Sequence, residues 1–280
     1  MRLLLTVPSL LMLLISWSVY AAGAPCGDLV PCEIDGGRYY ISTPPGWDGK
    51  TALAPAIYFH GHSSSGLNAL KNKRFVQSFH QSGYVLIAPD GAPRAGRKVL
   101  GWPAFPPSEG MRDDIAFVHA MLDDVARSIP LKMESSLVTG FSSGGSMAWY
   151  LACYSKRTYG AVLPVAGGLR RPLPASGQCP GGPRKLIHIH GFADLQVPLE
   201  GRGIRQWHQG DVFEALNVMR KTNGCVSRPS KTWSQGKFQC REWTGCSNGR
   251  QLAFCLHPGG HWMPKEWKTV GESWLRDGSK

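Results

Sequence analysis

The sequence predicts an α/β protein in which helices cover both faces of a mostly parallel, doubly wound sheet. Short apolar runs recur along the chain, segments of helical periodicity separate them, and Gly- or Pro-containing turns lie between the two. Buried parallel strands typically appear as short, continuous runs of apolar and β-branched residues. We predict strands at residues 38–42, 54–60, 84–88, 136–141, 161–166, 185–190 and 251–256.

The segments between these runs carry the periodicity of helices. Residues 112–127 are the clearest case, because Ile115, Val118 and Leu122 share one face and aspartates occupy another. Loops rich in Gly and Pro are predicted at 91–110 and 167–184. Sheets of this type bind ligands at the carboxyl ends of their strands, so residues that follow strands are the first candidates for a site. The remaining predicted helices are 67–81, 146–153, 211–221 and 265–275.

Residues 1–24 are predicted to be a secretory signal peptide rather than part of the fold. Arg2 precedes an apolar run over residues 3–15, and the small residues at 21–24 resemble a cleavage site. A transmembrane anchor is the weaker alternative, since Pro8 interrupts the run and a span needs ~20 apolar residues. We therefore expect a secreted or periplasmic protein without a membrane anchor, in which residues 25–280 form a single domain.

All eight cysteines lie beyond this leader, and an even number in an exported chain indicates disulfides. Eight cysteines allow 105 pairings, which the sequence leaves open. A zinc site is the alternative interpretation, but the chain has no C-x-x-C pair, and we expect no bound metal. Proximity in the sequence favours the pairs Cys26–Cys32, Cys153–Cys179, Cys225–Cys246 and Cys240–Cys255.

The formal net charge is +12, yet the basic residues are scattered along the chain. Nucleic-acid binding would require a basic stripe or a recognition motif, and neither is present, so we expect no nucleic-acid partner. The charge instead favours solubility, or attraction to acidic polymers outside the cell.

The most informative motif is G-x-S-x-G at residues 140–144, which follows a predicted strand and precedes a predicted helix. In this context the motif indicates a nucleophilic serine, here Ser142, at a sharp turn that needs small neighbours. The N–H groups at the start of the following helix point toward the place where negative charge develops during acyl transfer. We predict the N–H of Ser143 as one donor of an oxyanion hole.

A serine hydroxyl needs a base and a carboxylate to become a nucleophile, in the chain order Ser, Asp, His for this fold. Asp194 follows the predicted strand 185–190 and is the candidate acid, whereas Asp90 precedes the serine and is interpreted as a turn residue. The candidate base is His261, which follows two glycines near the C-terminus, with His257 as its nearest rival.

The second oxyanion donor should come from the loop after an early strand, where His60-Gly61 ends the run 54–60. His62 is the favoured donor, although the sequence does not separate it from Ser63. His60-x-His62 and His188-x-His190 could each place two imidazoles on one face of a strand, so a metal site is a minor alternative.

Taken together and in this order, these motifs resemble those of the polyhydroxybutyrate depolymerase-like esterases, secreted α/β-hydrolases that include feruloyl and acetylxylan esterases. The resemblance covers about residues 38–274 and rests on seven motifs. It implies the α/β-hydrolase fold, Ser142 as nucleophile, Asp194 as acid and His261 as base, and it supports the Cys225–Cys246 bridge. The motifs are His60-Gly61, Asp113-Asp114-Ile115-Ala116-Phe117, Gly140-Phe141-Ser142-Ser143-Gly144-Gly145, His190-Gly191-Phe192-Ala193-Asp194 with Val197-Pro198 behind it, Asn223-Gly224-Cys225, Trp243-Thr244-Gly245-Cys246 and Gly259-Gly260-His261.

We therefore expect an ester hydrolase that acts without a cofactor on a small-molecule or polymeric ester. Trp102, in the loop after a strand, and Trp262, next to His261, are predicted to line the substrate cleft and to suit a bulky or aromatic ester. A serine peptidase on the same fold and a non-catalytic binding protein are the alternatives.

Overall fold

The computed structural model describes residues 26–93, 99–103, 106–204, 207–247 and 249–277. The predicted signal peptide, residues 1–24, lies outside this part of the chain, as does Phe105 of the predicted loop 91–110. No helix among the described residues has the length and apolar character needed to cross a membrane.

A ten-stranded sheet forms the centre of the fold, in the order β1-β2-β4-β3-β7-β8-β9-β14-β13-β12. Strands β4, β3, β7, β8, β9 and β14 pair in parallel, and the strands at both edges pair antiparallel. The strand bounds are β1 Cys32–Ile34, β2 Gly37–Ser42, β3 Ala54–Phe59, β4 Tyr84–Pro89, β7 Leu137–Phe141, β8 Ala161–Val165, β9 Leu186–Gly191, β12 Lys231–Gln235, β13 Phe238–Trp243 and β14 Leu252–His257.

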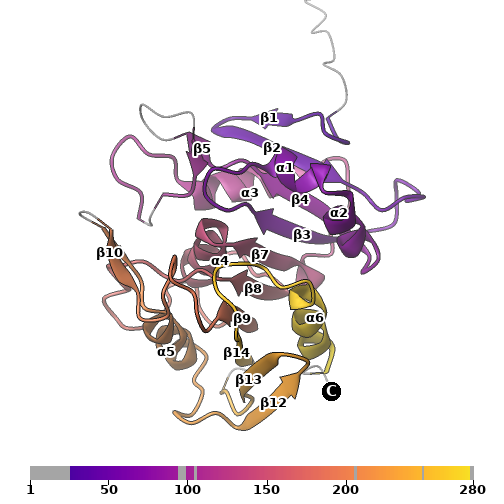
Figure 1. The fold of residues 1–280 in the computed structure, drawn as a ribbon. Helices are drawn as coiled ribbons and strands as arrows, with labels where there is room; N and C mark the ends of the chain where they lie inside the picture. Colours follow the sequence, from indigo (N-terminus) through magenta and orange to yellow (C-terminus); the bar gives the residue numbers. More distant parts are fainter. Residues whose placement is uncertain (1–25, 94–98, 104–105, 205–206, 248, 278–280) are drawn as a thin grey trace, which may run out of the picture.

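Helices cover both faces of this sheet, and the sheet separates two apolar cores (Figure 1). One core lies under α3 (Asp114–Val125), α4 (Ser143–Tyr154) and α5 (Val212–Thr222). The other lies under α1 (Gly66–Lys71), α2 (Lys73–His80) and α6 (Trp267–Asp277). The predicted fold class, a mostly parallel sheet with helices on both faces, is confirmed.

Two small ribbons and a 3-10 turn complete the described elements. The ribbons are β5 (Ala92–Pro93) with β6 (Leu100–Gly101), and β10 (Arg202–Ile204) with β11 (Trp207–Gln209). The turn is η1 (Met133–Ser135). All of them lie in stretches that the sequence did not assign to strands or helices.

The helices α1, α2, α3 and α5 begin at side chains that accept hydrogen bonds from the first free backbone N–H groups. Asp113 accepts from Ile115 and Ala116 at the start of α3, and Asp211 does the same for α5. Asn72 caps α2 in this way and ends α1, so the single helix predicted over 67–81 is in fact two helices. The helix predicted over 146–153 starts earlier, immediately after Ser142.

The antiparallel pair β12–β13 was not predicted from the sequence. Around a turn at Gly236, β13 alternates buried and exposed residues and β12 carries exposed and partly buried ones, as expected of an edge hairpin with one solvated face. Cys240 and Cys255 lie directly opposite each other in the register of β13 and β14, and a disulfide joins them.

Four disulfides join all eight cysteines, in the pairing that proximity in the sequence favours. Cys153–Cys179 ties the end of α4 to the loop before β9, and Cys225–Cys246 joins the segment after α5 to the segment after β13. Cys26–Cys32 closes a short loop before β1. The segment after α5 and the strands β13 and β14 are thus covalently tied to one another.

Candidate active site

Ser142 lies at the turn between β7 and α4 and has the backbone conformation of a strained turn, with φ of 57° and ψ of −120°. Both flanking glycines are required by close backbone contacts. A Cβ on Gly140 would lie 2.4 Å from the Gly144 carbonyl oxygen, and one on Gly144 would lie 2.0 Å from that of Phe59. The turn therefore projects the Ser142 side chain from the end of the sheet.

Asp194 follows β9 and is buried at the same end of the sheet. Its Oδ1 accepts hydrogen bonds from the N–H groups of Gln196 and Val197, at 2.9 and 2.8 Å. Burial acts to raise the pKa of Asp194, but hydrogen bonds from His190, His261 and Val197 outweigh it and hold the pKa well below its ordinary value. Asp194 is therefore a carboxylate at neutral pH.

His261 connects the serine to the aspartate. Its Nδ1 lies 2.7 Å from Asp194 Oδ2, and its Nε2 lies 2.9 Å from the Ser142 hydroxyl oxygen. Because the carboxylate can only accept a hydrogen bond, Nδ1 carries the proton and Nε2 is the acceptor that faces the serine. The three residues that the sequence singled out are thus brought into one hydrogen-bonded line.

Two loops that pack against each other produce this line. The N–H of Phe192 donates to the His257 carbonyl at 2.8 Å, and the N–H of Ala193 donates to that of Gly259 at 3.0 Å. These bonds join the loop of Asp194 to the loop of His261. His257, the rival base, instead accepts from the N–H of Gly259 through Nδ1 and belongs to the support of the loop.

The loop after β3 lies beside the serine and is fixed at its first residue. The N–H of Gly91 donates to His60 Nε2 at 2.9 Å, so His60 Nδ1 is protonated and donates to the Gly61 carbonyl at 2.7 Å. A Cβ on Gly61 would contact the Cβ of Ser142 at 3.7 Å. The loop that carries His62 therefore packs against the turn of the predicted nucleophile.

The prediction that Trp102 lines an exposed cleft is wrong. The Trp102 side chain is fully buried, packs edge-on against Phe59 at 5.0 Å, and donates its indole N–H to the His60 carbonyl at 2.8 Å. An indole placed under this loop buries its apolar ring while its N–H finds an acceptor. Trp102 supports the loop after β3, whereas Trp262 is 52% exposed beside His261.

Two features near the triad were missed in the sequence. Phe192 and Leu195, which flank the acid on its loop, are 72% and 82% exposed and add apolar surface to that loop. His190 Nε2 lies 3.4 Å from Asp194 Oδ2, beneath the acid. The His188-x-His190 spacing predicts a metal pair as a minor alternative, but among the described residues no group of three or more His, Cys, Asp or Glu is placed to hold a metal ion.

Asp90, the other strand-end carboxylate, has a structural role. Its Oδ1 accepts from the N–H of Gly66 at 2.7 Å, and its Oδ2 pairs with Arg38 at 2.7 Å. It therefore joins the start of α1 to β2 and β4. Neither of these bonds involves Ser142 or His261, in agreement with the interpretation of Asp90 as a turn residue.

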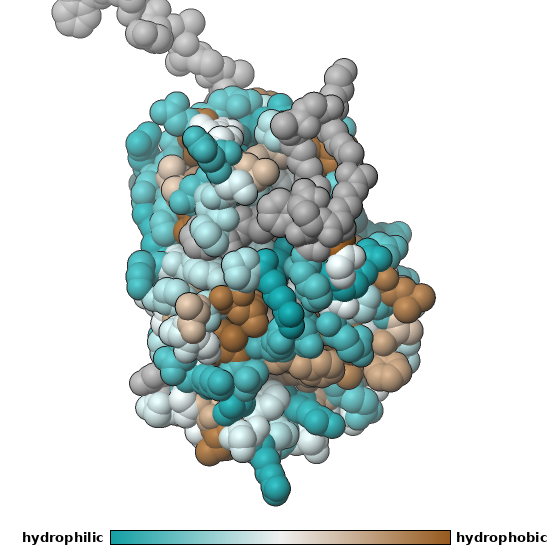
Figure 2. All heavy atoms as spheres, turned by 90° about the vertical axis from the view of Figure 1, so that its left-hand side faces the viewer, coloured by the Kyte–Doolittle hydropathy of each residue, from teal (hydrophilic) through white to brown (hydrophobic). Residues whose placement is uncertain are grey.

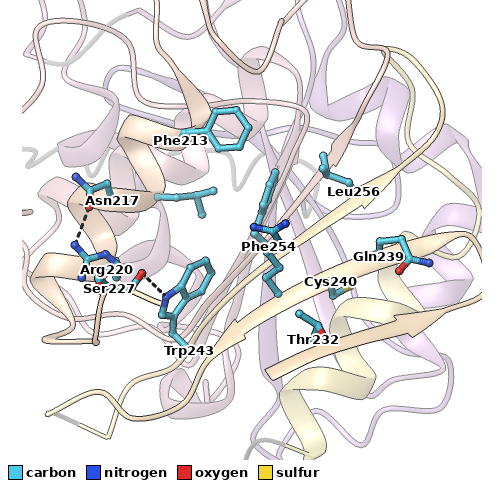
Figure 3. A pocket seen from close by; sticks show the side chains of 12 residues that line it. Phe213, Asn217, Arg220, Ser227, Thr232, Gln239, Cys240, Trp243, Phe254 and Leu256 are labelled. Atoms are coloured by element: carbon cyan, nitrogen blue, oxygen red, sulfur yellow. Dashed lines mark hydrogen bonds between the residues drawn. The ribbon is translucent and has the colours of Figure 1, made fainter. Parts of the chain in front are cut away.

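A pocket of about 620 Å³ lies away from these residues, between α5 and the strands β12 to β14 (Figure 3). Phe213 of α5 faces Phe254 and Leu256 of β14 across it, and Leu216 also lines it. None of Ser142, Asp194 and His261 lines this pocket, and the hydrogen-bonded line at the strand ends remains the candidate for the chemistry.

No family model matches the chain. A probable feruloyl esterase C of Aspergillus terreus is 28% identical over 240 residues, which cover 82% of this chain and 77% of the relative. A feruloyl esterase C of Emericella nidulans is 27% identical over 241 residues, with the same two coverages. Among solved structures, an acetyl xylan esterase from Aspergillus awamori aligns with a TM-score of 0.61 at 15% identity, over 86% of this chain and 94% of that one.

The structural neighbour supports the α/β-hydrolase fold. The two sequence relatives match this chain at nearly the same identity and over the same share of its length. This agrees with the feruloyl esterase side of the resemblance noted in the sequence. The chain is similar in sequence to feruloyl esterases and is a carboxylic ester hydrolase, with the α/β-hydrolase fold.

Proposed function

We propose that Ser142, His261 and Asp194 form the catalytic triad of this ester hydrolase. The observation that carries the proposal is the continuous line from the Ser142 hydroxyl through both ring nitrogens of His261 to Asp194, at 2.9 and 2.7 Å. Ser142 Oγ attacks the ester carbonyl while His261 Nε2 accepts its proton, and the proton then passes to the leaving alcohol. Water then attacks the acyl-enzyme through the same steps and releases the carboxylic acid product.

The tetrahedral oxyanion is stabilised by two backbone N–H groups. Ser143 is the first residue of α4, so its N–H has no partner within the helix and lies at the positive end of the helix dipole. For the second donor, the N–H of Ser63 is directed at the Leu100 carbonyl at 3.4 Å, which favours His62 over Ser63. Loss of one such donor typically raises the barrier by about 2.7–4 kcal/mol.

The substrate class that the site favours is an ester with a bulky or aromatic acyl group, of the feruloyl type. Trp262, Phe192 and Leu195 are exposed on the two loops that carry the triad histidine and aspartate. The strand β3 ends on the left-hand side of Figure 1. Figure 2 views that side directly and shows apolar side chains among hydrophilic ones. The names of the sequence relatives support the same acyl class.

We also propose that the protein is exported, after removal of residues 1–24. The basic start, the apolar run and the small residues of that segment support a cleaved leader. Four disulfides that use all eight cysteines support an oxidising compartment.

The proposal is tested by hydrolysis of p-nitrophenyl acetate and methyl ferulate by the wild type and Ser142→Ala. We expect turnover by the wild type and its loss in the variant, and a serine-directed sulfonyl fluoride should add its mass to the Ser142 peptide only. Ser176→Ala, which alters an exposed loop serine, is the matched control. Equal turnover by Ser142→Ala would contradict the triad.

The same assay distinguishes the substrate classes. Acetylated xylan, hydroxybutyrate oligomers and the amide counterpart of the ferulate ester are compared with methyl ferulate. A preference for methyl ferulate supports the proposed acyl class. Hydrolysis of the amide in preference to the ester would favour the serine peptidase that the sequence left open.

A further inference from the structure

Two fully buried histidines and a tryptophan lie in a line beneath the proposed triad. The Trp149 indole N–H donates to His188 Nδ1 at 3.2 Å, and His188 Nε2 lies 2.9 Å from His190 Nδ1. His190 Nε2 lies 2.8 Å from the Val197 carbonyl oxygen and 3.4 Å from Asp194 Oδ2. All three side chains have no exposed surface, and the line links α4 to the loop of the acid.

The direction of every hydrogen bond in this line follows from its first member. An indole N–H can only donate, so His188 Nδ1 is an acceptor and the His188 proton lies on Nε2. That proton is donated to His190 Nδ1, and His190 therefore carries its own proton on Nε2. Burial, with a contribution from the neighbouring His190, lowers the pKa of His188 well below its ordinary value and keeps this ring neutral.

The His190 proton points at the segment that holds the acid. The Val197 carbonyl accepts from His190 Nε2, while the Val197 N–H donates to Asp194 Oδ1 at 2.8 Å. The same Nε2 faces Asp194 Oδ2, the oxygen that accepts from His261. One imidazole thus fixes both the backbone of this loop and the side of the carboxylate that must face His261.

Burial of two imidazoles needs a reason, because polar groups in a core lose free energy of hydration that apolar side chains would not lose. Here all four ring nitrogens of His188 and His190 have hydrogen-bond partners. These hydrogen bonds offset the lost free energy of hydration, and they exist only in this arrangement of the rings. The Phe254 ring stacks on His188 with centroids 5.8 Å apart and separates it from the pocket of Figure 3. The line is therefore closed to water on that side.

We propose that Trp149, His188 and His190 form a relay that sets the tautomer of His190, and that His190 is a positioning residue for Asp194. This inference rests on the proposed triad but concerns residues outside it. His190 touches no reacting atom, and it acts by holding the Asp194 carboxylate and its loop in the orientation that His261 requires.

The tautomers can be read without any substrate. Long-range 1H–15N spectra of the protein labelled at its histidines distinguish Nδ1–H, Nε2–H and doubly protonated rings. At neutral pH we expect His188 and His190 both to be neutral and protonated on Nε2, with assignment by His188→Leu and His190→Leu. A proton on Nδ1 of either ring, or a cationic His188, would overturn the relay whatever the enzyme hydrolyses.

The positioning role is tested by His190→Leu and His190→Gln with p-nitrophenyl acetate. Loss of a hydrogen bond to a charged group should lower kcat by about 10- to 100-fold in His190→Leu, with little change in KM. The glutamine amide N–H can replace Nε2–H, so His190→Gln should recover much of that loss. His119→Leu is the matched control, because His119 bonds to Ser155, which follows α4, and lies outside the line of Trp149, His188 and His190.

A purely structural role for His190 would give a different set of results. The proton between His261 Nδ1 and Asp194 Oδ2 should give a low-field 1H resonance that is lost or shifted in His190→Leu and restored in His190→Gln. An unchanged resonance and kcat in folded His190→Leu would overturn the positioning role. If Ser142→Ala were instead fully active, the triad itself would fail, while the tautomer spectra would still decide the relay.

Discussion

A Cβ on Gly144 would lie 2.0 Å from the carbonyl oxygen of Phe59, so the turn that carries Ser142 packs directly against the end of β3. The same Cβ would lie 2.6 Å from the carbonyl oxygen of His60. The absence of a side chain at Gly144 therefore sets the distance between the proposed nucleophile and the loop that supplies the second oxyanion donor.

Gly144→Ala is expected to damage stability and activity together. The new methyl group meets backbone atoms that cannot rotate away, and overpacking of this kind typically costs about 1–3 kcal/mol of unfolding free energy. Urea denaturation and p-nitrophenyl acetate turnover measure the two effects. Gly203→Ala is the control, because nothing lies within 4 Å of a Cβ at that position. A Gly144→Ala protein as stable and active as the control would contradict this account.

Asp114 is expected to make the protein less stable as pH rises from about 4 to about 7. Burial raises its pKa to about 6 from 3.8, although Arg112 at 2.6 Å acts in the opposite direction. Its Oδ2 is buried without a hydrogen-bond partner among the described residues. The folded state therefore binds more protons than the unfolded state in this range, and the unfolding free energy falls as pH increases.

Asp114→Asn removes this titration and allows it to be measured. Relative to the wild type, the variant should gain up to about 3 kcal/mol of unfolding free energy between about pH 4 and about pH 7. Urea denaturation of both proteins at several pH values gives the difference, in which the contributions of other groups largely cancel. A difference that does not vary with pH would contradict the assignment.

The parallel strands could be predicted because their residues are buried on both faces. The expected strand 161–166 corresponds to β8 at Ala161–Val165, and 84–88 corresponds to β4 at Tyr84–Pro89. The edge strand β12 has no buried residue and β13 alternates buried and exposed residues over a short length, and such patterns also fit a loop. The break between α1 and α2 depends on the Asn72 side chain, which caps α2. The helical periodicity of the sequence continues through Asn72, so the pattern alone predicts one helix.

The members of the candidate site could be predicted from their order and from their places after strands. Their mutual orientation could not, because it depends on bonds between the Phe192 and His257 regions that no local pattern encodes. Trp102 illustrates the same limit. Its place after a strand predicts a cleft residue. In the structure its indole N–H donates to the His60 carbonyl, and the ring is buried in the core.

Removal of the Cys225–Cys246 disulfide is expected to destabilise the C-terminal part of the fold without preventing hydrolysis. The bridge spans 21 residues, and loops of this size typically contribute about 3 kcal/mol of unfolding free energy. The double variant Cys225→Ala/Cys246→Ala should lose about this amount in urea denaturation. Cys26→Ala/Cys32→Ala, which opens a loop of only 6 residues, should lose less. The reverse order of the two losses would contradict the prediction.

The exposed apolar rim on the acid loop is expected to select the acyl group rather than to perform chemistry. Phe192 and Leu195 are so exposed that Phe192→Ala/Leu195→Ala should leave the fold intact. Loss of an apolar contact with an aromatic acyl group should raise KM for methyl ferulate by about 10-fold, while p-nitrophenyl acetate, with its small acyl group, should be little affected. Val226→Ala removes a comparably exposed apolar side chain after α5 and is the control. If both esters lose activity equally, or neither does, then the rim does not bind the acyl group and Trp262 alone would have to supply the preference.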